Sequence, residues 1–579
     1  MTKPNVVYVL TDDTSYGDLG CTGNNIVNTP NIDELYGESV HFTNFHVGPT
    51  CAPTRSGLMT GHYANSTGVW HTVGGRSLLR KNEWTIANAF KEAGYTTGIF
   101  GKWHLGDEAP YRPYERGFDV SIVHGGGGIS QTPDFWGNDY FDDTYSVNGE
   151  YKQFKGYCTD VFFEEAKKFI TDNKDKPFFC YLPTNAPHGP YNVARKYSDK
   201  YMDKVSDSMA KFYGMMENID ENVGSMREFL KEIGIADNTI FMYMTDNGTG
   251  GGAAVDKDGF LTKGLNGGFR GKKGSPYEGG HRVPFFMHWK DGNLTTARDI
   301  DEVTANVDFM PTLLDLCGIE VSKDVSFHGT SMKPLIEGDN SNFIDRVIVT
   351  DSQRISTPVK WRESAVCSDE WRLINGKELY KIREDKEQRD DVASKYPEVV
   401  EKLRGEYDKW WDIVSTQIAQ PIPISVGTEE MLITCHDAVS PTSKVAWMQG
   451  HVRNAMVCNG HYEIDVTESG KYRIECRRWS RETDVAICDE IAPENDVEFE
   501  KDGVLEEEWY NYQGSTAMFV GAACIKVQDK SCSKVVEKDD KAAVFEIELE
   551  KGITTLEPTF TGRGANEIFI PYYTYIVKI

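Results

Sequence analysis

Near its start the chain reads Asn5-Val6-Val7-Tyr8-Val9-Leu10, followed at once by Thr11-Asp12-Asp13. This nearly continuous apolar run is typical of a strand buried on both faces, as in a parallel sheet between two layers of helices. The carboxyl ends of such strands are where open α/β sheets bind ligands. An isolated Asp-Asp pair would suit a solvated turn, so a functional reading of Asp12 and Asp13 needs further support.

A second stretch repeats this pattern far away in the sequence. The run Thr239-Ile240-Phe241-Met242-Tyr243-Met244 is followed by Thr245-Asp246-Asn247-Gly248. Two strands that each end in two oxygen-bearing side chains predict a site for a hard cation, because Ca²⁺ takes several carboxylate and amide oxygens.

Cys51-Ala52-Pro53-Thr54-Arg55 contains the most suggestive cysteine of the chain. A lone cysteine is usually a small buried apolar residue. Here the flanking Pro49 and Pro53 predict a turn and favour exposure of Cys51. A helix that starts near Thr54 would bring backbone N–H groups and a positive dipole beside it, and Arg55 adds a charge. These features predict an anion-binding nucleophile, with a thiolate as the simplest candidate.

Two more predicted strands end in polar residues. Residues 95–100 lead into Gly101-Lys102-Trp103-His104-Leu105-Gly106, where the glycines allow Lys102 and His104 to face one pocket. Residues 177–182 lead to Asn185-Ala186-Pro187-His188. A single histidine is more often structural than catalytic, so His188 gains weight only from its place at a strand end.

These motifs resemble the signature of the formylglycine-dependent sulfatases of the alkaline phosphatase superfamily. The similarity rests on Cys51 to Arg55 with Thr60-Gly61, on Gly101 to Gly106, and on residues 273–284, which read Lys-Gly-Ser-Pro-Tyr-Glu-Gly-Gly-His-Arg-Val-Pro. It covers about residues 4 to 415. It implies that a formylglycine-generating maturase oxidises Cys51, and that the hydrate of the resulting formylglycine is the nucleophile.

The same resemblance implies a role for each matching residue. The metal ligands would be Asp12, Asp13, Asp246, Asn247 and the modified Cys51. Ca²⁺ is favoured over Mg²⁺, although ligand type separates the two poorly. Lys102 and Lys273 would bind the sulfate, with Lys272 as an ambiguous neighbour. His104 and Arg55 would position the formylglycine, and His188 would face the leaving oxygen.

The fold implied is α/β, an alkaline-phosphatase-like sandwich with a large mixed, mostly parallel sheet between helices, over residues 1–330. A smaller α+β C-terminal subdomain would cover residues 331–420. After Gln420 the runs 461–466, 471–476 and 543–549 alternate with period two, which predicts an appended antiparallel all-β, sandwich-like domain over 425–579. Its role is either sugar binding, as in a lectin, or packing that shapes the active-site rim.

Composition limits the partners. The 579 residues carry a formal net charge of −27, which argues against nucleic acid and requires local cations for an anionic substrate. The 12 cysteines contain no CxxC pair, so neither a zinc site nor a dense disulfide scaffold is predicted. One or two disulfides from Cys435 onward are left open. No apolar run is long enough to span a bilayer, and no targeting segment is found. The resemblance favours a periplasmic or secreted protein whose signal is replaced by Met1, with a cytoplasmic location left open.

The substrate is predicted to be a sulfated sugar at a chain end, such as galactose or a related hexose. This rests on the glycine-rich insert 124–128 and the aromatic, acidic segment 134–143. These could fold over the site, stack on a sugar and form an acidic rim. A surface loop packed by its own aromatics is an equal alternative. A phosphate or phosphonate ester hydrolase of the same superfamily and a non-catalytic carbohydrate-binding protein are the rival functions.

Overall fold

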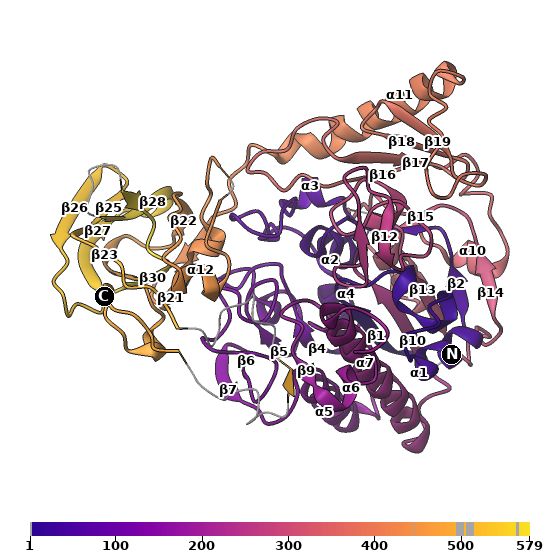
Figure 1. Cartoon of the computed structure of the whole chain (residues 1–579), viewed down its shortest axis with the longest axis horizontal. Coiled ribbons are helices and arrows are strands. Elements are labelled where there is room, and N and C mark those ends of the chain that lie inside the picture. Colours follow the sequence, from indigo (N-terminus) through magenta and orange to yellow (C-terminus); the bar gives the residue numbers. More distant parts are fainter. Residues whose placement is uncertain (1–2, 323, 443, 494–502, 505–513, 563–566) are drawn as a thin grey trace.

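The computed structural model describes residues 3–322, 324–442, 444–493, 503–504, 514–562 and 567–579. Its largest sheet has ten strands. Their order is β14 (Arg298–Ile300), β2 (Val40–Phe42), β13 (Phe285–His288), β10 (Thr239–Thr245), β1 (Asn5–Thr11), β8 (Phe178–Pro183), β4 (Thr96–Lys102), β5 (Val120–His124), β6 (Thr144–Val147) and β7 (Glu150–Gln153) (Figure 1).

The centre of this sheet is parallel, and antiparallel pairs flank it on both sides, although the edge strand β14 pairs in parallel with β2. β10, β1, β8, β4 and β5 pair in parallel, whereas β13 and β6 run antiparallel to their neighbours. The predicted mixed, mostly parallel sheet is therefore confirmed. Because the central strands run in the same direction, their carboxyl ends meet at one edge.

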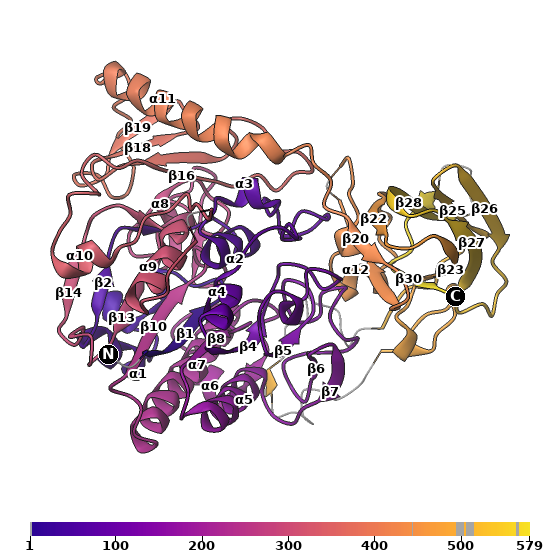
Figure 2. The same ribbon diagram turned by 180° about the vertical axis from the view of Figure 1, so that it is seen from behind.

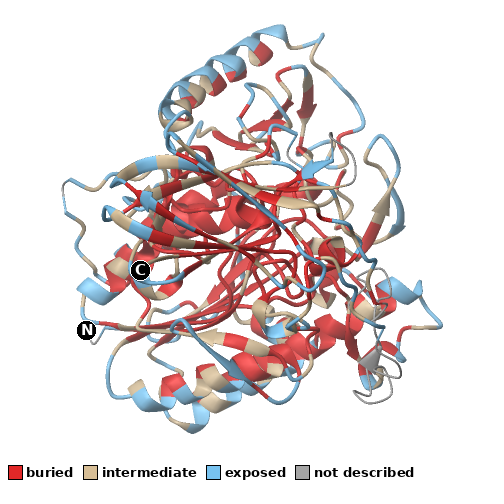
Figure 3. Cartoon of the chain, turned by 90° about the vertical axis from the view of Figure 1, so that its left-hand side faces the viewer, coloured by how far each residue is buried: buried red, intermediate tan, exposed pale blue. Residues whose placement is uncertain are grey.

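Helices cover both faces of the sheet, because side chains alternate along β1. Val6, Tyr8 and Leu10 belong to one apolar core, and Val7 and Val9 to another. The first core includes α2 (Cys51–Thr60), α4 (Ile86–Glu92), α9 (Phe309–Leu316) and α10 (Lys333–Glu337). The second includes α1 (Pro30–Gly37), α5 (Cys158–Asn173) and α7 (Asp207–Glu232). Figure 3 shows the buried residues gathered between these layers.

A smaller antiparallel sheet follows. It consists of β16 (Ile348–Asp351), β17 (Ser364–Cys367), β18 (Trp371–Ile374) and β19 (Glu378–Lys381). α11 (Pro397–Val414) packs Leu403, Tyr407 and Trp410 against one face of this sheet, while the other face shares a core with Val303 and Val307 of the main region.

The C-terminal region is all-β apart from short helical turns and lies at one end of the molecule (Figures 1 and 2). One sheet holds β20 (Ile424–Val426), β22 (Tyr462–Val466), β28 (Gly552–Thr561), β25 (Ala522–Val527), β26 (Lys530–Val535) and β29 (Ile568–Phe569). The other holds β21 (Met431–Thr434), β30 (Tyr573–Lys578), β23 (Gly470–Arg477) and β27 (Ala543–Leu549). The two sheets share one apolar core.

The expectation of a purely antiparallel C-terminal region needs one correction. β20 pairs in parallel with β22. β20 is the strand by which the linker enters, and residues 427–461 separate it from β22, which is long enough for a crossover connection.

Short elements connect these parts. They are β3 (Phe45–His46), α3 (Ala64–Thr67), β9 (Val193–Ala194), α6 (Arg195–Ser198), β11 (Ala253–Val255), β12 (Leu261–Gly264), α8 (Glu278–His281), β15 (Thr304–Ala305), α12 (Gln449–Arg453) and β24 (Gly503–Val504). Within the described ranges, every helix is too short or too polar to cross a membrane.

Candidate active site

The ends of β1 and β10 bring four of the five predicted metal ligands together, namely Asp12, Asp13, Asp246 and Asn247. Thr11 lies opposite Thr245 in the parallel register, so Asp12 and Asp246 leave neighbouring strands side by side. Asp13 donates a hydrogen bond from its backbone N to Asp246 Oδ1 at 3.1 Å, and Asn247 Nδ2 donates to Asp13 Oδ1 at 2.9 Å.

This group of oxygens suits a cation. All four side chains are buried. Asp12 Oδ1 and Asn247 Oδ1 have no hydrogen-bond partner among the described residues. Burial and the neighbouring Asp246 raise the pKa of Asp12 well above its usual value, which shows how unfavourable the uncompensated charges are. Ligand atoms of Asp12, Cys51 and Asp246 lie within 4.8 Å of one another. Buried carboxylates with unpaired oxygens are the donor set of a hard cation.

Cys51 is the first residue of α2, so the helix begins three residues earlier than the sequence predicts. Its Sγ lies within 4.8 Å of carboxylate oxygens of Asp12, Asp13 and Asp246. The predicted exposure is wrong, because Cys51 is only 2% exposed and α2 is buried along its whole length. Burial raises the pKa of the Cys51 thiol to about 11, although Lys102 and Lys273 oppose this shift. The simple thiolate nucleophile is therefore not supported.

Arg55 lies one turn along α2 from Cys51 and is fully buried. Its Nη2 donates to Asp246 Oδ2 at 2.9 Å, and its Nη1 donates to the carbonyl of Lys102 at 3.0 Å. Arg55 thus ties the start of α2 to the ends of β10 and β4.

Lys102 and His104 reach the same site from the end of β4. Lys102 Nζ donates to Asp12 Oδ2. His104 Nε2 lies 2.9 Å from the carbonyl of Thr72, so this nitrogen carries the ring proton. His104 Nδ1 is buried without a described partner and can therefore accept a proton.

His188 and Lys273 complete the set. His188 Nδ1 donates to the carbonyl of Gly189 at 2.7 Å, and Nε2 lies 3.8 Å from Asp13 Oδ2. Burial and the charge of Lys273 lower the pKa of His188 to about 3. Lys273 Nζ donates to Asp13 Oδ2 at 2.8 Å, whereas Lys272 does not line the site. All the predicted site residues thus converge.

The glycine-rich insert lies against the site, as the sequence predicts, and Gly127 lines the cavity. A Cβ atom at Gly127 would lie 2.2 Å from His104 Cε1, and one at Gly128 would lie 3.1 Å from His188 Cε1. These glycines allow the backbone to pack directly on the two imidazole rings.

The segment 134–143 does not form an aromatic or acidic rim. Trp136 packs edge-on against Trp479 with ring centroids 5.4 Å apart, and Phe135 packs on Tyr151. Asp134 accepts hydrogen bonds from the backbone N of Gly125 and Ser130. The acidic side chains of the insert therefore support its own fold, as in the surface-loop alternative.

The site opens into a cavity of about 770 Å³. Besides the predicted residues, its lining includes His71, Thr72, Gln131, Tyr191, Arg354, Lys444, Trp447 and Met456. The sequence did not reveal these residues, because they come from loops and from the C-terminal β region, where no motif marks them.

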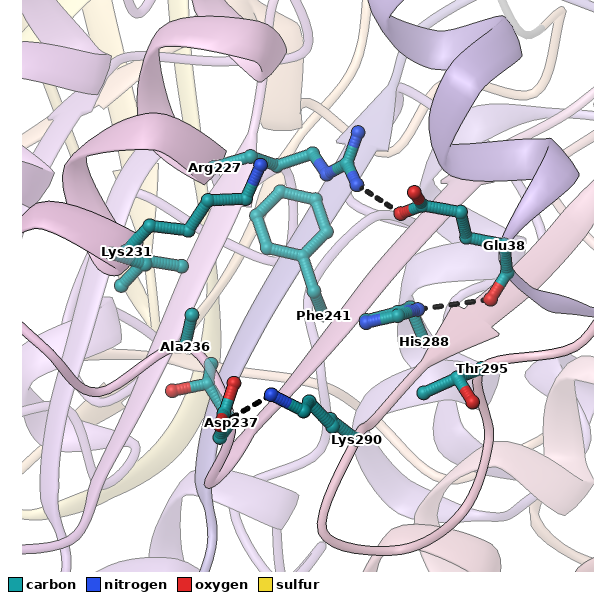
Figure 4. Close-up of a pocket in the computed structure, with 11 residues that line it drawn as sticks. Glu38, Arg227, Lys231, Ala236, Asp237, Phe241, His288, Lys290 and Thr295 are labelled. Atoms are coloured by element: carbon teal, nitrogen blue, oxygen red, sulfur yellow. Dashed lines mark hydrogen bonds and ion pairs between the residues drawn. The ribbon is translucent and has the colours of Figure 1, made fainter.

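A second cavity of about 530 Å³ lies at the opposite end of β10 (Figure 4). Its cations are already paired, since Arg227 Nη2 lies 2.6 Å from Glu38 and Lys290 Nζ lies 2.7 Å from Asp237. Both its charge pairing and its distance from Cys51 make it a poor candidate for the reaction.

Comparison with known families agrees with this geometry. A family model described as Sulfatase matches residues 4–319, which is more than half of the chain. The chain belongs to the sulfatase family. A second model, described as N-sulphoglucosamine sulphohydrolase, C-terminal, matches residues 269–410 of this sulfatase. The C-terminal β region lies outside both matches.

Individual relatives point the same way. Arylsulfatase J of Mus musculus is 27% identical over 469 residues, which cover 69% of this chain and 74% of the relative. N-acetylgalactosamine-6-sulfatase of Homo sapiens is 28% identical over 364 residues, which cover 58% of this chain and 66% of the relative. A crystal structure of Ps i-CgsB in complex with k-i-k-neocarrahexaose is 26% identical, with a TM-score of 0.63, and covers 72% of this chain and 98% of that one. The protein is thus an enzyme that hydrolyses sulfate esters.

Proposed function

We propose that this sulfatase removes a sulfate ester from the terminal sugar of a glycan, galactose or a related hexose. The observation that carries the proposal is that Cys51, His188 and Lys273 line one cavity, while the buried Lys102 contacts Asp12 beside them. The names of the relatives support a carbohydrate substrate, because one is an N-acetylgalactosamine-6-sulfatase and another was crystallised with an oligosaccharide. A cavity favours a chain end over an open groove that would hold a polymer.

Cys51 is proposed to act after a maturase has converted it to formylglycine. The raised pKa of its thiol supports this, because a neutral thiol is a weak nucleophile. The hydrate of formylglycine supplies an oxygen nucleophile in place of sulfur. Its position at the first turn of α2 places backbone N–H groups and the positive helix end beside an anionic substrate.

Asp12, Asp13, Asp246, Asn247 and the modified Cys51 would hold the metal, and Ca²⁺ fits this set best. The unpaired oxygens of Asp12 and Asn247 support the assignment. A bound divalent cation neutralises negative charge that develops on the sulfate oxygens. Mg²⁺ is less suited, because it prefers to keep several waters of its own.

The remaining side chains bind the sulfate and move protons. Lys102 and Lys273 supply fixed positive charge where the sulfate oxygens would lie. His104 Nδ1, unpartnered and unprotonated, can take a proton from the hydrate. His188 faces the leaving oxygen and needs a proton on Nε2 to protonate it, which the negative charge of a bound sulfate ester favours.

Two finer assignments also belong to this proposal. We divide the chain into a catalytic domain (1–330), a subdomain (331–420) and a β domain (425–579), which the separate sheets support. We also place the protein in the periplasm or outside the cell, on the basis of its family.

A substrate screen tests the proposal. Protein coexpressed with a maturase would be incubated with mono- and oligosaccharides sulfated at known positions, and sulfate release measured. We expect release from terminal sugars. Preferential release from internal positions of long polymers would contradict the chain-end assignment. Faster hydrolysis of matched phosphate esters would favour the rival function.

A further inference from the structure

One wall of the active-site cavity comes from the C-terminal β region. Lys444, Val445, Trp447 and Met456 line the cavity together with Asp13 and Cys51. Residues more than 390 positions apart in the sequence therefore face the same space, and the β region contributes directly to the surface that lines the site.

Hydrogen bonds join this wall to residues 130–135, which follow the glycine-rich insert. Thr132 donates from its backbone N to the carbonyl of Trp447 at 3.0 Å and from Oγ1 to the carbonyl of Ala446 at 2.5 Å. Gln449 donates from its backbone N to the carbonyl of Ser130 at 3.0 Å. The amide of Gln449 is buried and lies 3.2 Å from three further carbonyls, those of Gln131, Asp134 and Phe135. The backbone from Ala446 to Gln449 is thus held against residues 130–135.

The cavity lining carries two cations without a partner among the described residues, one from this wall and one from the smaller subdomain. Arg354 and Lys444 line the cavity, are exposed, and form no ion pair or side-chain hydrogen bond with any other residue in the described part of the chain. Asp13 is the only carboxylate among the described lining residues, and it is already bound by Lys273. The chain has 89 acidic and 62 basic residues, so unpaired cations beside a site for anions call for an explanation.

The charge of Arg354 acts on the interior of the cavity. After burial, Arg354 is the largest cause of the lowered pKa of His71, which also lines the cavity and is neutral as a result. Lys444 approaches from the β region. Two cations from different parts of the fold therefore line the same cavity as Lys273.

From these observations we propose that the substrate carries a second anionic group, a carboxylate or a second sulfate, which Arg354 and Lys444 bind. The proposal rests on the proposed function and narrows its substrate class. Charge-assisted hydrogen bonds to such a group would orient the sugar with its scissile sulfate inward. Trp447 also lines the cavity, and its indole would pack against the sugar between the two anionic groups. Because both cations are exposed, they favour binding of the substrate and take no part in the chemical step.

Matched substrate pairs test this proposal. Starting from the best substrate of the screen, one pair replaces a neutral neighbouring hexose by a hexuronic acid. The other pair adds a second sulfate away from the scissile one. The matured wild-type enzyme is expected to show about tenfold higher kcat/KM for the dianionic member of one pair, the size of one charge-assisted hydrogen bond. The pair that shows the preference identifies the group as carboxylate or sulfate.

Three variants complete the experiment. Lys444→Met and Arg354→Gln should each reduce the preference severalfold through a higher KM, with kcat and the mono-anionic substrate little changed. Lys526→Met removes an exposed lysine of β25 that does not line the cavity, and should leave the preference intact.

Two results would overturn the proposal. One is equal kcat/KM for both members of both pairs in the wild-type enzyme. The other is a wild-type preference that survives both substitutions. A matured enzyme that releases no sulfate from any sugar would instead contradict the proposed function.

Discussion

Lys273 Nζ donates a hydrogen bond to Asp13 Oδ2 at 2.8 Å and lies 2.6 Å from Asp13 Oδ1. Asp13 follows the central strand β1, whereas Lys273 belongs to the glycine-rich loop before α8, 260 residues later. Burial would lower the pKa of Lys273, but Asp13, Cys51 and Asp12 raise it above its usual value. The loop therefore delivers a permanent positive charge to the strand ends, beside Cys51.

The charge of Lys273 is predicted to be essential, whereas that of its neighbour is not. Lys273→Ala should lower kcat/KM by about 10² to 10³, as the loss of a preorganised charge does. Lys272→Ala is the matched control and should be mild, since Lys272 does not line the cavity. Steady-state kinetics on one sulfated sugar checks both variants. Damage from the Lys272 substitution alone would show that the loop is assigned in the wrong register.

Removal of the metal should lower both activity and stability. The buried carboxylates of Asp12, Asp13 and Asp246 repel one another without a cation, so treatment with a chelator should reduce Tm and sulfate release. Added Ca²⁺ should restore both. At a hundredfold excess over Kd it should raise the free energy of unfolding by about 2.7 kcal/mol. Mg²⁺ should restore less. Asp246→Asn should weaken the response, and Asp529→Asn, at an exposed position, should keep it. A Tm unaffected by chelator and by Ca²⁺ would contradict the metal site.

Gln449 is predicted to couple the β region to the active site. Gln449→Ala leaves the carbonyl of Asp134 and the backbone N of Gly137 without partners, which should cost about 2 kcal/mol and raise KM as the wall shifts. Calorimetry and steady-state kinetics measure the two effects. Gln153→Ala, in the exposed strand β7, is the control and should change neither. An unchanged KM in Gln449→Ala would show that the wall does not depend on this contact.

His62 should make stability depend on pH near the end of α2. Burial alone would lower the pKa of His62, but Glu83 at 2.6 Å and the carbonyl of Ser326 raise it above its ordinary value. The pair of protonated His62 and Glu83 therefore stabilises the fold fully below the unfolded pKa of about 6.5. This stabilisation is lost as pH rises through the folded pKa of His62. His62→Gln should lower Tm more at pH 6 than at pH 9.

A second histidine provides a control of opposite sign. Burial lowers the pKa of His451, so it is neutral when folded and its burial becomes unfavourable as pH falls. The change in Tm caused by His451→Gln should therefore be more positive at pH 6 than at pH 9. The same pH trend in both variants would mean that Glu83 does not hold His62 in its charged form.

Residues at strand ends were the most predictable part of the site. Asp12 and Asp246 follow apolar runs, and parallel strands bring their carboxyl ends to one edge, so the pattern predicts that both lie at that edge. The pairing of β1 with β10 then places them side by side. The large sheet was predictable for the same reason. The parallel pairing of β20 was not, because a short linker strand carries no periodicity that fixes its direction.

The outer part of the cavity was beyond sequence reasoning. Arg354, Lys444 and Trp447 lie in irregular segments without a motif. The packing of the β region against the insert brings Lys444 and Trp447 to the site, whereas Arg354 comes from the loop between β16 and β17. The exposure of Cys51 was mispredicted for a related reason. Turn residues indicate a loop, but they do not show that surrounding elements bury the helix that follows.

The central claim is that Cys51 acts as formylglycine. The most direct test is mass spectrometry of the peptide that contains Cys51, from protein coexpressed with a maturase, alongside the activity of the same sample. We predict that the thiol is replaced by an aldehyde or its hydrate, in proportion to activity, and that Cys51→Ala folds but has no turnover. Active protein that carries only unmodified cysteine at position 51 would contradict the account.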